Sequence, residues 1–127
     1  MRKVSAYGAG AGAGGAARGR GYLVAEDDSG RILGGCGFAE VASTPGTAEL
    51  QKLYVSQACR GTGIGRELAT DVIDAARRAG YERLYLETHH VLGAAMSLYS
   101  SLGFERIDGP LPGSAHTTMD LFYLLGL

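Results

Sequence analysis

The glycine-rich stretch RGTGIG, residues 60–65, constrains the fold of this chain more strongly than its other features. It lies between an apolar run and a segment whose apolar residues recur at helical spacing. Glycine adopts backbone conformations closed to other residues and lets a backbone come close to a ligand. The first turn of a helix carries unpaired N–H groups and the positive end of the helix dipole. The order strand, glycine turn, helix therefore predicts a cradle for a phosphate group.

Arg60 begins this stretch and Arg66 directly follows it, and both can add charge-assisted hydrogen bonds to a phosphate. The pattern G-x-x-x-x-G-K-[ST] of a P-loop does not occur, which argues against ATP or GTP hydrolysis. A glycine-rich loop that only caps the helix and binds no ligand is the alternative interpretation.

Alternation of apolar and polar residues predicts strands on both sides of the glycine turn. The expected strands cover residues 22–27, 31–41, 49–55, 82–88, 104–107 and 116–125. Helices are expected from residue 64 to 79, with Gly80 as a C-terminal cap, and from 93 to 102. Antiparallel strands, a helical crossover and further antiparallel strands predict a mixed α/β sheet in one layer with helices packed on it.

A chain of 127 residues predicts one domain with a single core. The formal net charge of −1 argues against a general nucleic-acid binder. The apolar runs are far shorter than the ~20 residues of a membrane span, and no signal peptide is evident. Two cysteines, Cys36 and Cys59, provide neither a disulfide framework nor a zinc set, so the simplest expected location is the cytoplasm.

Residues 8–21, GAGAGAGGAARGRG, contain seven Gly, five Ala and two Arg. Such a segment has no large apolar side chain whose burial could offset its ordering entropy. The sequence therefore predicts a Gly/Ala-rich N-terminal arm over residues 1–21, followed by one domain over residues 22–127. The arm contains a G-x-G-x-x-G pattern, but no helix fits after it, which argues against a dinucleotide-binding fold.

The order of segments resembles the GNAT superfamily of N-acetyltransferases. The family's pyrophosphate motif, Q/R-x-x-G-x-G/A, is matched by Arg60, Gly63 and Gly65. ELQKLYV before the motif, and RLYLET and AMSLYSSLGFERI after it, also appear in the order and spacing of the family. The resemblance implies a mostly antiparallel sheet with a central splayed strand pair and flanking helices. It also implies direct transfer of an acetyl group from acetyl-CoA to an amine, with no metal ion.

The resemblance assigns the cofactor site to the third strand and the glycine turn. The backbone N–H groups from Gly61 to Arg66 are expected to bind the pyrophosphate. Residues 53–55 are expected to pair with the pantetheine arm as an added strand, and the Leu53 N–H to face the thioester carbonyl. The expected cofactor-binding residues are Leu53, Tyr54, Val55, Arg60, Gly61, Thr62, Gly63, Ile64, Gly65 and Arg66.

Two residues are expected to move protons. An aliphatic amine has a pKa near ~10, so it must lose a proton before it attacks the thioester. Glu49 stands where several family members carry a glutamate base; a surface carboxylate is the alternative. Tyr99 matches the family tyrosine that protonates the leaving thiolate, and a core aromatic residue is its alternative. His89 or His90 could also serve as the base, and with His116 they show no metal spacing.

The chain departs from the family in two places. Leu92 replaces an asparagine that many members carry seven residues before the tyrosine. A second departure is upstream, where the family normally has a strand and two helices that form much of the acceptor wall. The expected acceptor is a small amine or an amino-acid-like molecule, and a homodimer could close the open wall. The alternative is a module that binds acyl-CoA without turnover.

Overall fold

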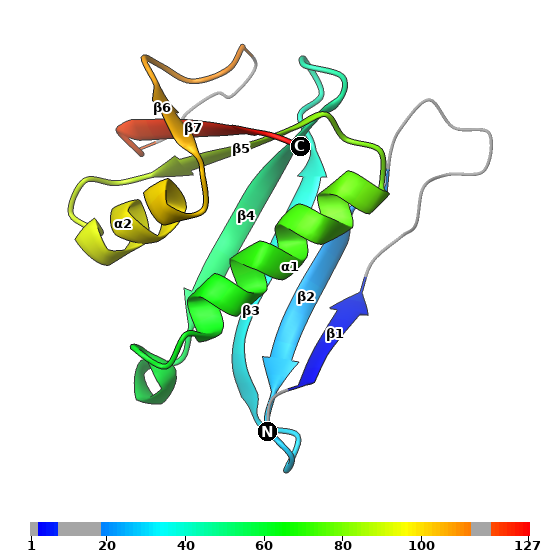
Figure 1. Cartoon of the computed structure of the whole chain (residues 1–127), viewed down its shortest axis with the longest axis vertical. Coiled ribbons are helices and arrows are strands. Elements are labelled where there is room, and N and C mark those ends of the chain that lie inside the picture. Colours follow the sequence, from blue (N-terminus) through cyan, green and yellow to red (C-terminus); the bar gives the residue numbers. More distant parts are fainter. Residues whose placement is uncertain (1–2, 8–18, 113–117) are drawn as a thin grey trace.

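The computed structural model describes residues 3–7, 19–112 and 118–127, and within them seven strands form one sheet (Figure 1). The strands follow the order β1-β2-β3-β4-β5-β7-β6. Their bounds are β1 Lys3–Tyr7, β2 Gly21–Glu26, β3 Ile32–Glu40, β4 Thr47–Val55, β5 Arg83–Thr88, β6 Glu105–Ile107 and β7 Leu121–Gly126. Neighbouring strands are antiparallel except β4 and β5, which are parallel. The mixed, mostly antiparallel sheet predicted from the sequence is confirmed.

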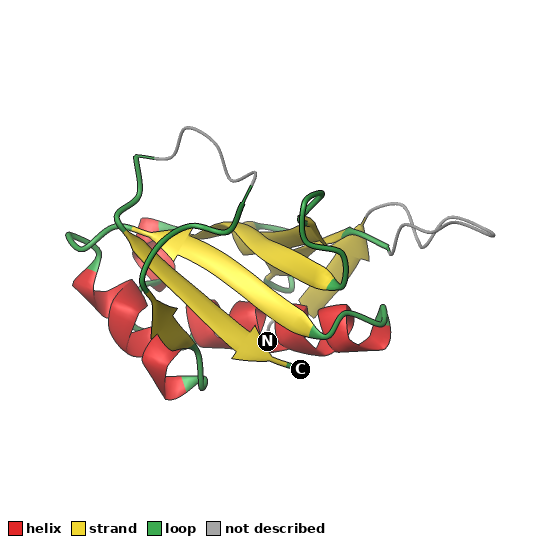
Figure 2. Cartoon of the chain, turned by 90° about the horizontal axis from the view of Figure 1, so that it is seen from above, coloured by secondary structure: helices red, strands yellow, loops and turns green. Residues whose placement is uncertain are grey.

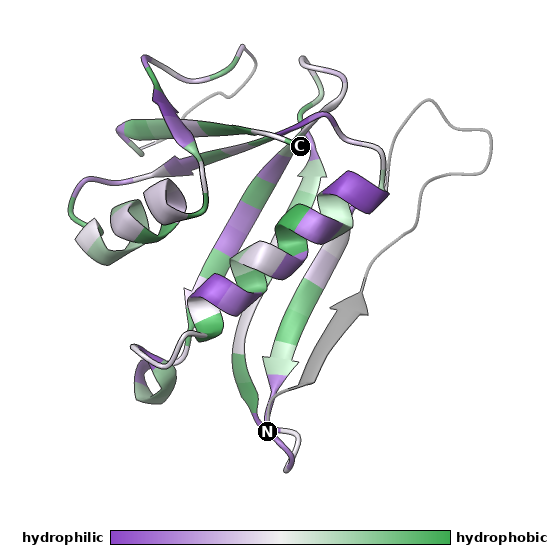
Figure 3. Ribbon diagram, in the orientation of Figure 1, coloured by the Kyte–Doolittle hydropathy of each residue, from purple (hydrophilic) through white to green (hydrophobic). Residues whose placement is uncertain are grey.

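Two helices cover one face of this sheet, as Figure 2 shows from above. Helix α1 (Ile64–Arg78) follows β4 and a short 3₁₀ helix, η1 (Gln57–Cys59); helix α2 (Gly93–Ser101) follows β5. Figure 3 shows hydrophilic and hydrophobic residues alternating along α1, as expected for a helix with one buried side. Leu68, Val72 and Ala76 on that side are fully buried. None of the helices in the described part of the chain is long and apolar enough to cross a membrane.

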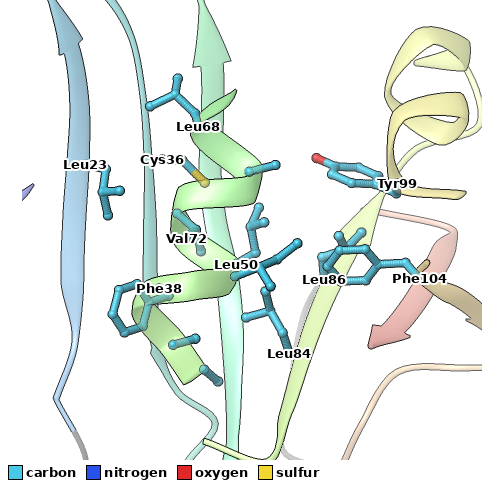
Figure 4. Packing of buried hydrophobic residues seen from close by; sticks show 14 of the residues in the cluster. Leu23, Cys36, Phe38, Leu50, Leu68, Val72, Leu84, Leu86, Tyr99 and Phe104 are labelled. Atoms are coloured by element: carbon cyan, nitrogen blue, oxygen red, sulfur yellow. The ribbon is translucent and has the colours of Figure 1, made fainter. Parts of the chain in front are cut away.

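The hydrophobic core lies between the sheet and the helices (Figure 4). Side chains from β2, β3 and β4 meet those of α1 on one side, and side chains from β5, α2 and the turn after α2 meet on the other. The residues labelled in Figure 4 are Leu23, Cys36, Phe38, Leu50, Leu68, Val72, Leu84, Leu86, Tyr99 and Phe104. The core therefore joins both halves of the sheet through one continuous cluster.

Both helices end in the same glycine motif. Gly80 after α1 has φ 91°, and Gly103 after α2 has φ 96°. The N–H of Gly80 donates to the Arg77 carbonyl, and the next N–H, that of Tyr81, donates to the Ala76 carbonyl, both at 3.1 Å. This pattern is a Schellman motif, which satisfies carbonyls at a helix end. The cap predicted at Gly80 therefore lies one residue past the last turn, where a left-handed backbone favours glycine.

The parallel strands β4 and β5 diverge after a short region of pairing. They pair only from Thr47 to Glu49 and from Arg83 to Tyr85. Lys52, three residues past the last pair in β4, has φ 54°, which is uncommon for a residue with a side chain. The register of β4 against β3 also shifts near this point. The splayed central pair that the resemblance implied is confirmed.

Residues 3–7, which fall within the arm predicted for residues 1–21, form β1 and pair with β2. At the other end of the predicted arm, the Gly19 carbonyl accepts a hydrogen bond of 2.8 Å from the buried Tyr81 hydroxyl. The intervening residues 8–18 lie outside the described residues. The division into an arm and a domain therefore stays a prediction.

Candidate active site

The predicted phosphate cradle is a glycine turn that starts α1. Gly61 and Gly63 have φ 79° and 88°, so both positions favour glycine through backbone conformation. Gly63 is the N-cap of α1, and its carbonyl accepts the first helical bond from the Glu67 N–H at 3.0 Å. The N–H groups of residues 64–66 precede that bond and point out of the helix start. The backbone N–H groups at this helix start can therefore bind an anion.

Gly65 differs from the two glycines before it. It lies inside α1, and an added Cβ there would lie 3.4 Å from Val55 Cγ2 and 3.9 Å from Leu98 Cδ2, which are ordinary contact distances. At Gly61 and Gly63 an added Cβ would meet open space. The turn therefore requires glycine at Gly61 and Gly63 for the backbone conformation and leaves room for alanine at Gly65.

The two arginines that flank the glycines of the turn lie in different surroundings. Arg60 is exposed and ends the 3₁₀ helix. The Arg66 guanidinium donates to the Ser101 hydroxyl at 2.6 Å, and Ser101 in turn donates to the Leu98 carbonyl at 2.7 Å. Arg66 therefore links α1 to α2, a contact that sequence spacing alone does not reveal.

A cavity of about 220 Å³ lies where β4 and β5 diverge. The two strands, α2 and the segment before β7 each contribute to its walls. The lining residues are Leu50, Lys52, Leu53, Glu87, Thr88, Leu92, Ala95, Tyr99 and Met119. Two predicted site residues, Leu53 and Tyr99, are thus brought together across a gap in the sheet.

Tyr99 lies in the core with only 6% of its surface exposed. Its ring contacts Phe104 at 5.8 Å and Tyr123 at 6.2 Å between centroids. Its carbonyl accepts the Phe104 N–H at 3.1 Å in the motif that ends α2, which fixes the backbone as well. Burial, and then the charge of Cys36, raises the pKa of Tyr99 to about 12. The hydroxyl is therefore protonated at neutral pH, and Figure 4 shows it pointing away from Phe104.

Two glutamates lie on the diverging strands. Burial raises the pKa of Glu49 above its ordinary value of 4.5; the Gln51 hydrogen bond opposes this shift and the charge of Glu87 adds to it. Glu49 does not line the cavity, whereas Glu87 does. The Tyr85 hydroxyl donates to a Glu87 carboxylate oxygen at 2.7 Å. Glu87 is a candidate that sequence reasoning missed, because only the divergence of the strands exposes it to the cavity.

The adjacent histidines lie just beyond β5. The His90 backbone N–H donates to Asp120 Oδ1 at 2.9 Å, and His90 Nδ1 lies 2.5 Å from Asp120 Oδ2. The hydrogen bond with the His90 side chain lowers the pKa of Asp120. His89 does not pair with this carboxylate in the same way; its Nδ1 accepts the Val91 N–H at 3.3 Å. Neither histidine lines the cavity, and His116 lies outside the described residues.

A second cavity, of about 300 Å³, lies over β2, β3 and β4. It is lined by Arg20, Gly21, Tyr22, Gly37, Phe38, Ala39, Gln51 and Lys52. Lys52 lines both cavities, Tyr99 lines the smaller one and not the larger, and the glycine turn lines neither. The smaller cavity is therefore the better candidate for chemistry.

Comparisons with known proteins identify the family of this chain. The model of the acetyltransferase (GNAT) family matches residues 11–104. A relative from Escherichia coli (strain K12), named uncharacterized N-acetyltransferase YjgM, is 39% identical over 104 residues, or 81% of this chain and 62% of the relative. N-acetyltransferase 8 of Rattus norvegicus is 39% identical over 92 residues, or 70% of this chain and 41% of that protein. The chain thus spans less than two thirds of the length of these relatives.

Solved structures share the fold. A GNAT-family acetyltransferase from Staphylococcus aureus Mu50 matches with a TM-score of 0.74 and 26% identity, covering 84% of this chain and 67% of that one. The structure of yncA, a putative acetyltransferase from Salmonella typhimurium with its cofactor acetyl-CoA, matches with a TM-score of 0.69 and 31% identity, covering 84% and 64%. With the family model matching more than half of its residues, this chain belongs to the acetyltransferase (GNAT) family.

Proposed function

We propose that this chain binds acetyl-CoA and transfers its acetyl group directly to a primary amine of a small-molecule or amino-acid-like acceptor. The observation that carries the proposal is the cavity between β4 and β5, which Leu53 and Tyr99 both line. The glycine turn at the start of α1 lies outside the lining of this cavity and would supply the anion-binding end of the site. A match to a structure with acetyl-CoA bound supports the choice of cofactor.

The cofactor would lie along one side of this cavity. The N–H groups from Gly61 to Arg66 would hold the pyrophosphate, because a helix start favours an anion. Residues 53–55, which β5 leaves unpaired, would pair with the pantetheine arm. The Leu53 N–H would then stabilise negative charge on the thioester oxygen, an effect worth ~3 kcal/mol in comparable sites.

Proton transfer completes the proposal. A carboxylate takes a proton from the acceptor ammonium, the amine nitrogen forms a bond to the acetyl carbon, and the carbon–sulfur bond breaks. The Tyr99 hydroxyl, protonated at neutral pH, gives its proton to the leaving thiolate, and the second proton that the nitrogen loses as the amide forms restores this hydroxyl. Glu49, with its raised pKa, is the base that the resemblance implied, and Glu87 is a second candidate because it lines the cavity. The two negative charges also favour a cationic acceptor.

Thermal unfolding with and without acetyl-CoA tests the cofactor step, with NADH as the control ligand. A ligand at a hundred times its dissociation constant adds ~2.7 kcal/mol, which raises the midpoint of a domain of this size by several degrees. A rise with acetyl-CoA but not with NADH is expected. Equal midpoints in all three samples would overturn the proposed cofactor site.

Acetyl transfer to a panel of primary amines tests the reaction. Steady release of free CoA with at least one amine is expected. Of the variants Glu49→Gln and Glu87→Gln, the one that lowers the rate of transfer identifies the base. A midpoint rise with acetyl-CoA together with no transfer to any amine would instead indicate a module that binds acyl-CoA without turnover.

Two further proposals concern the cellular location and the oligomeric state of the chain. We propose a cytoplasmic location, which is supported by two free cysteines, Cys36 and Cys59. We also propose a homodimer, because a second copy could close the acceptor side of the cavity. Light scattering that shows only monomer at high concentration would remove the dimer.

A further inference from the structure

Two segments far apart in sequence leave the sheet at one point beside the cavity. Thr88, the last residue of β5, pairs with Leu121, the first residue of β7. The Asp120 N–H still donates to the Thr88 carbonyl at 3.2 Å, so the ladder extends by one bond. The residues just after Thr88 and just before Leu121 are therefore neighbours in space, and these are His89, His90 and Asp120.

The chain turn after β5 places two imidazole rings together. Consecutive residues of an extended strand point to opposite faces, so adjacent histidines are normally separated. Here the Leu92 N–H donates to the His89 carbonyl at 2.9 Å, which marks a turn immediately after the strand. The rings of His89 and His90 consequently lie 4.5 Å apart between centroids with 30° between their planes.

The Asp120 carboxylate is held next to these rings by His90. Its two oxygens contact the His90 backbone N–H at 2.9 Å and the His90 Nδ1 at 2.5 Å. One potential ligand atom from each of His89, His90 and Asp120 lies within 4.8 Å of the other two. His89 is partly buried and the other two residues are exposed, so a bound ion could complete its coordination with water.

We propose that His89, His90 and Asp120 bind a divalent first-row transition-metal ion of the Zn²⁺ or Ni²⁺ type at the rim of the cavity. Two imidazole nitrogens and one carboxylate oxygen are a ligand set that suits these ions. Mg²⁺ and Ca²⁺ prefer all-oxygen sites and are not expected to bind. A simple His90–Asp120 ion pair is the competing explanation, and it gives His89 no part in the cluster.

An ion bound to this cluster would link two segments that border the cavity. The cavity is lined by Thr88, which precedes His89 in the chain, and by Met119, which precedes Asp120. An ion bound by all three ligands would tie the loop between β5 and α2 to the start of β7. Binding is therefore expected to raise the unfolding midpoint, because the ion binds the folded arrangement and not the separated segments.

Isothermal titration calorimetry of the full chain with ZnCl₂ tests the site, with MgCl₂ as the control salt. The Cys59→Ser background removes a partly exposed thiol that could also bind Zn²⁺. One Zn²⁺ per chain is expected, whereas Mg²⁺ gives no heat of binding. His89→Ala, His90→Ala and Asp120→Asn are each expected to weaken binding at least about tenfold, since even outer-shell changes cost that much.

Asp108→Asn, an exposed aspartate in the loop after β6, is the matched control and should leave Zn²⁺ binding unchanged. Unfolding midpoints measured without metal show whether each variant is folded. Absence of Zn²⁺ binding to the parent chain would overturn the site. Parent-like Zn²⁺ binding by His89→Ala would also overturn it, because His89 would then have no part in the cluster. The calorimetry needs no turnover, so its outcome is separate from that of the acetyl-transfer proposal.

Discussion

Tyr99 illustrates how one side chain can serve both the core and the cavity. Its ring packs against Phe104 and Tyr123, as expected of a core aromatic residue, while the residue also lines the cavity. The two readings of Tyr99 that the sequence leaves open are therefore compatible in structural terms. Its role as an acid remains a prediction, and the raised pKa gives that prediction a pH range.

Replacing Tyr99 with phenylalanine is expected to lower kcat about 100-fold, the lower end of the range for general acid catalysis, with little change in acetyl-CoA affinity. Because the Tyr99 pKa is raised to about 12, the hydroxyl stays protonated from pH 7 to 10. The kcat of the parent chain should therefore show no loss due to Tyr99 over that range. A Tyr99→Phe variant with the parent kcat would contradict the acid role.

Replacing Glu49 with glutamine is expected to change the pH dependence of stability. The folded-state pKa of Glu49 is raised above 4.5, mainly by burial, so the folded chain holds this proton more tightly than the unfolded chain. The stabilisation is present below pH 4.5 and is lost as the pH rises through the folded pKa. Relative to the parent chain, Glu49→Gln should therefore become more stable as the pH rises from 4 to 7.

Unfolding midpoints of both chains at several pH values check this prediction. Glu105→Gln, on the exposed edge strand β6, serves as the control and should follow the parent chain. A constant difference between Glu49→Gln and the parent chain from pH 4 to 7 would show that the carboxyl titrates alike in the folded and unfolded states.

The start of α1 is fixed by its glycines in two different ways. Gly61 and Gly63 have left-handed backbone conformations, whereas Gly65 is an ordinary helical residue with room for a methyl group. This difference matches the family motif, which accepts alanine at the position of Gly65. The alternate glycines in the sequence do not by themselves distinguish these two roles, because the distinction depends on the backbone angle at each position.

Gly63→Ala is expected to reduce both stability and acetyl-CoA binding, whereas Gly65→Ala should preserve both. A left-handed conformation costs a residue with a side chain roughly 1–2 kcal/mol, so alanine at Gly63 would distort the turn. The midpoint rise with acetyl-CoA measures binding in each variant. Equal effects of the two substitutions would contradict this account of the turn.

Close packing of β3 against β4 and α1 depends on a third kind of glycine. A Cβ at Gly34 would lie 2.6 Å from the Tyr54 carbonyl oxygen and 3.1 Å from Leu68 Cδ1. Gly34→Ala is therefore expected to destabilise the chain by about 2 kcal/mol through overpacking, lowering the unfolding midpoint by several degrees. Gly109→Ala is the control, since a Cβ there meets nothing within 4 Å. Equal midpoints for the two variants would rule out the steric explanation.

The molecule as a whole is tied together by contacts between residues distant in sequence. Tyr81 follows α1, and its hydroxyl holds the carbonyl of Gly19, just before β2. Tyr81 also packs edge-on against Phe38 of β3, with ring centroids 6.2 Å apart. These contacts fix the entry to β2 against the turn that leads into β5.

Tyr81→Phe is expected to destabilise the chain by about 1 kcal/mol, because the buried hydrogen bond is lost and the Gly19 carbonyl loses a partner. The ring contact with Phe38 is retained, so the loss reports on the hydroxyl. Denaturant unfolding that gives the parent free energy would contradict a stabilising role for this bond.

Much of this protein follows from local rules that act over a few residues. Side-chain periodicity indicated the helices and most strands, and glycine positions indicated the starts and ends of the helices. Boundaries were less certain: β7 begins at Leu121, well inside the segment predicted from residue 116, and β4 begins at Thr47 instead of Glu49. The resemblance to a family, carried by motifs in order, supplied the splayed strand pair and the expected cofactor.

The tertiary structure decided which chemical groups meet. Glu87 reaches the cavity because β4 and β5 diverge, and Asp120 reaches His89 and His90 because β5 and β7 pair in one register. Neither fact is encoded in the spacing of residues, since a contact between segments 30 residues apart depends on strand order and register. The sequence by itself therefore determined the elements and their order, and only the packed sheet determined which side chains share a site.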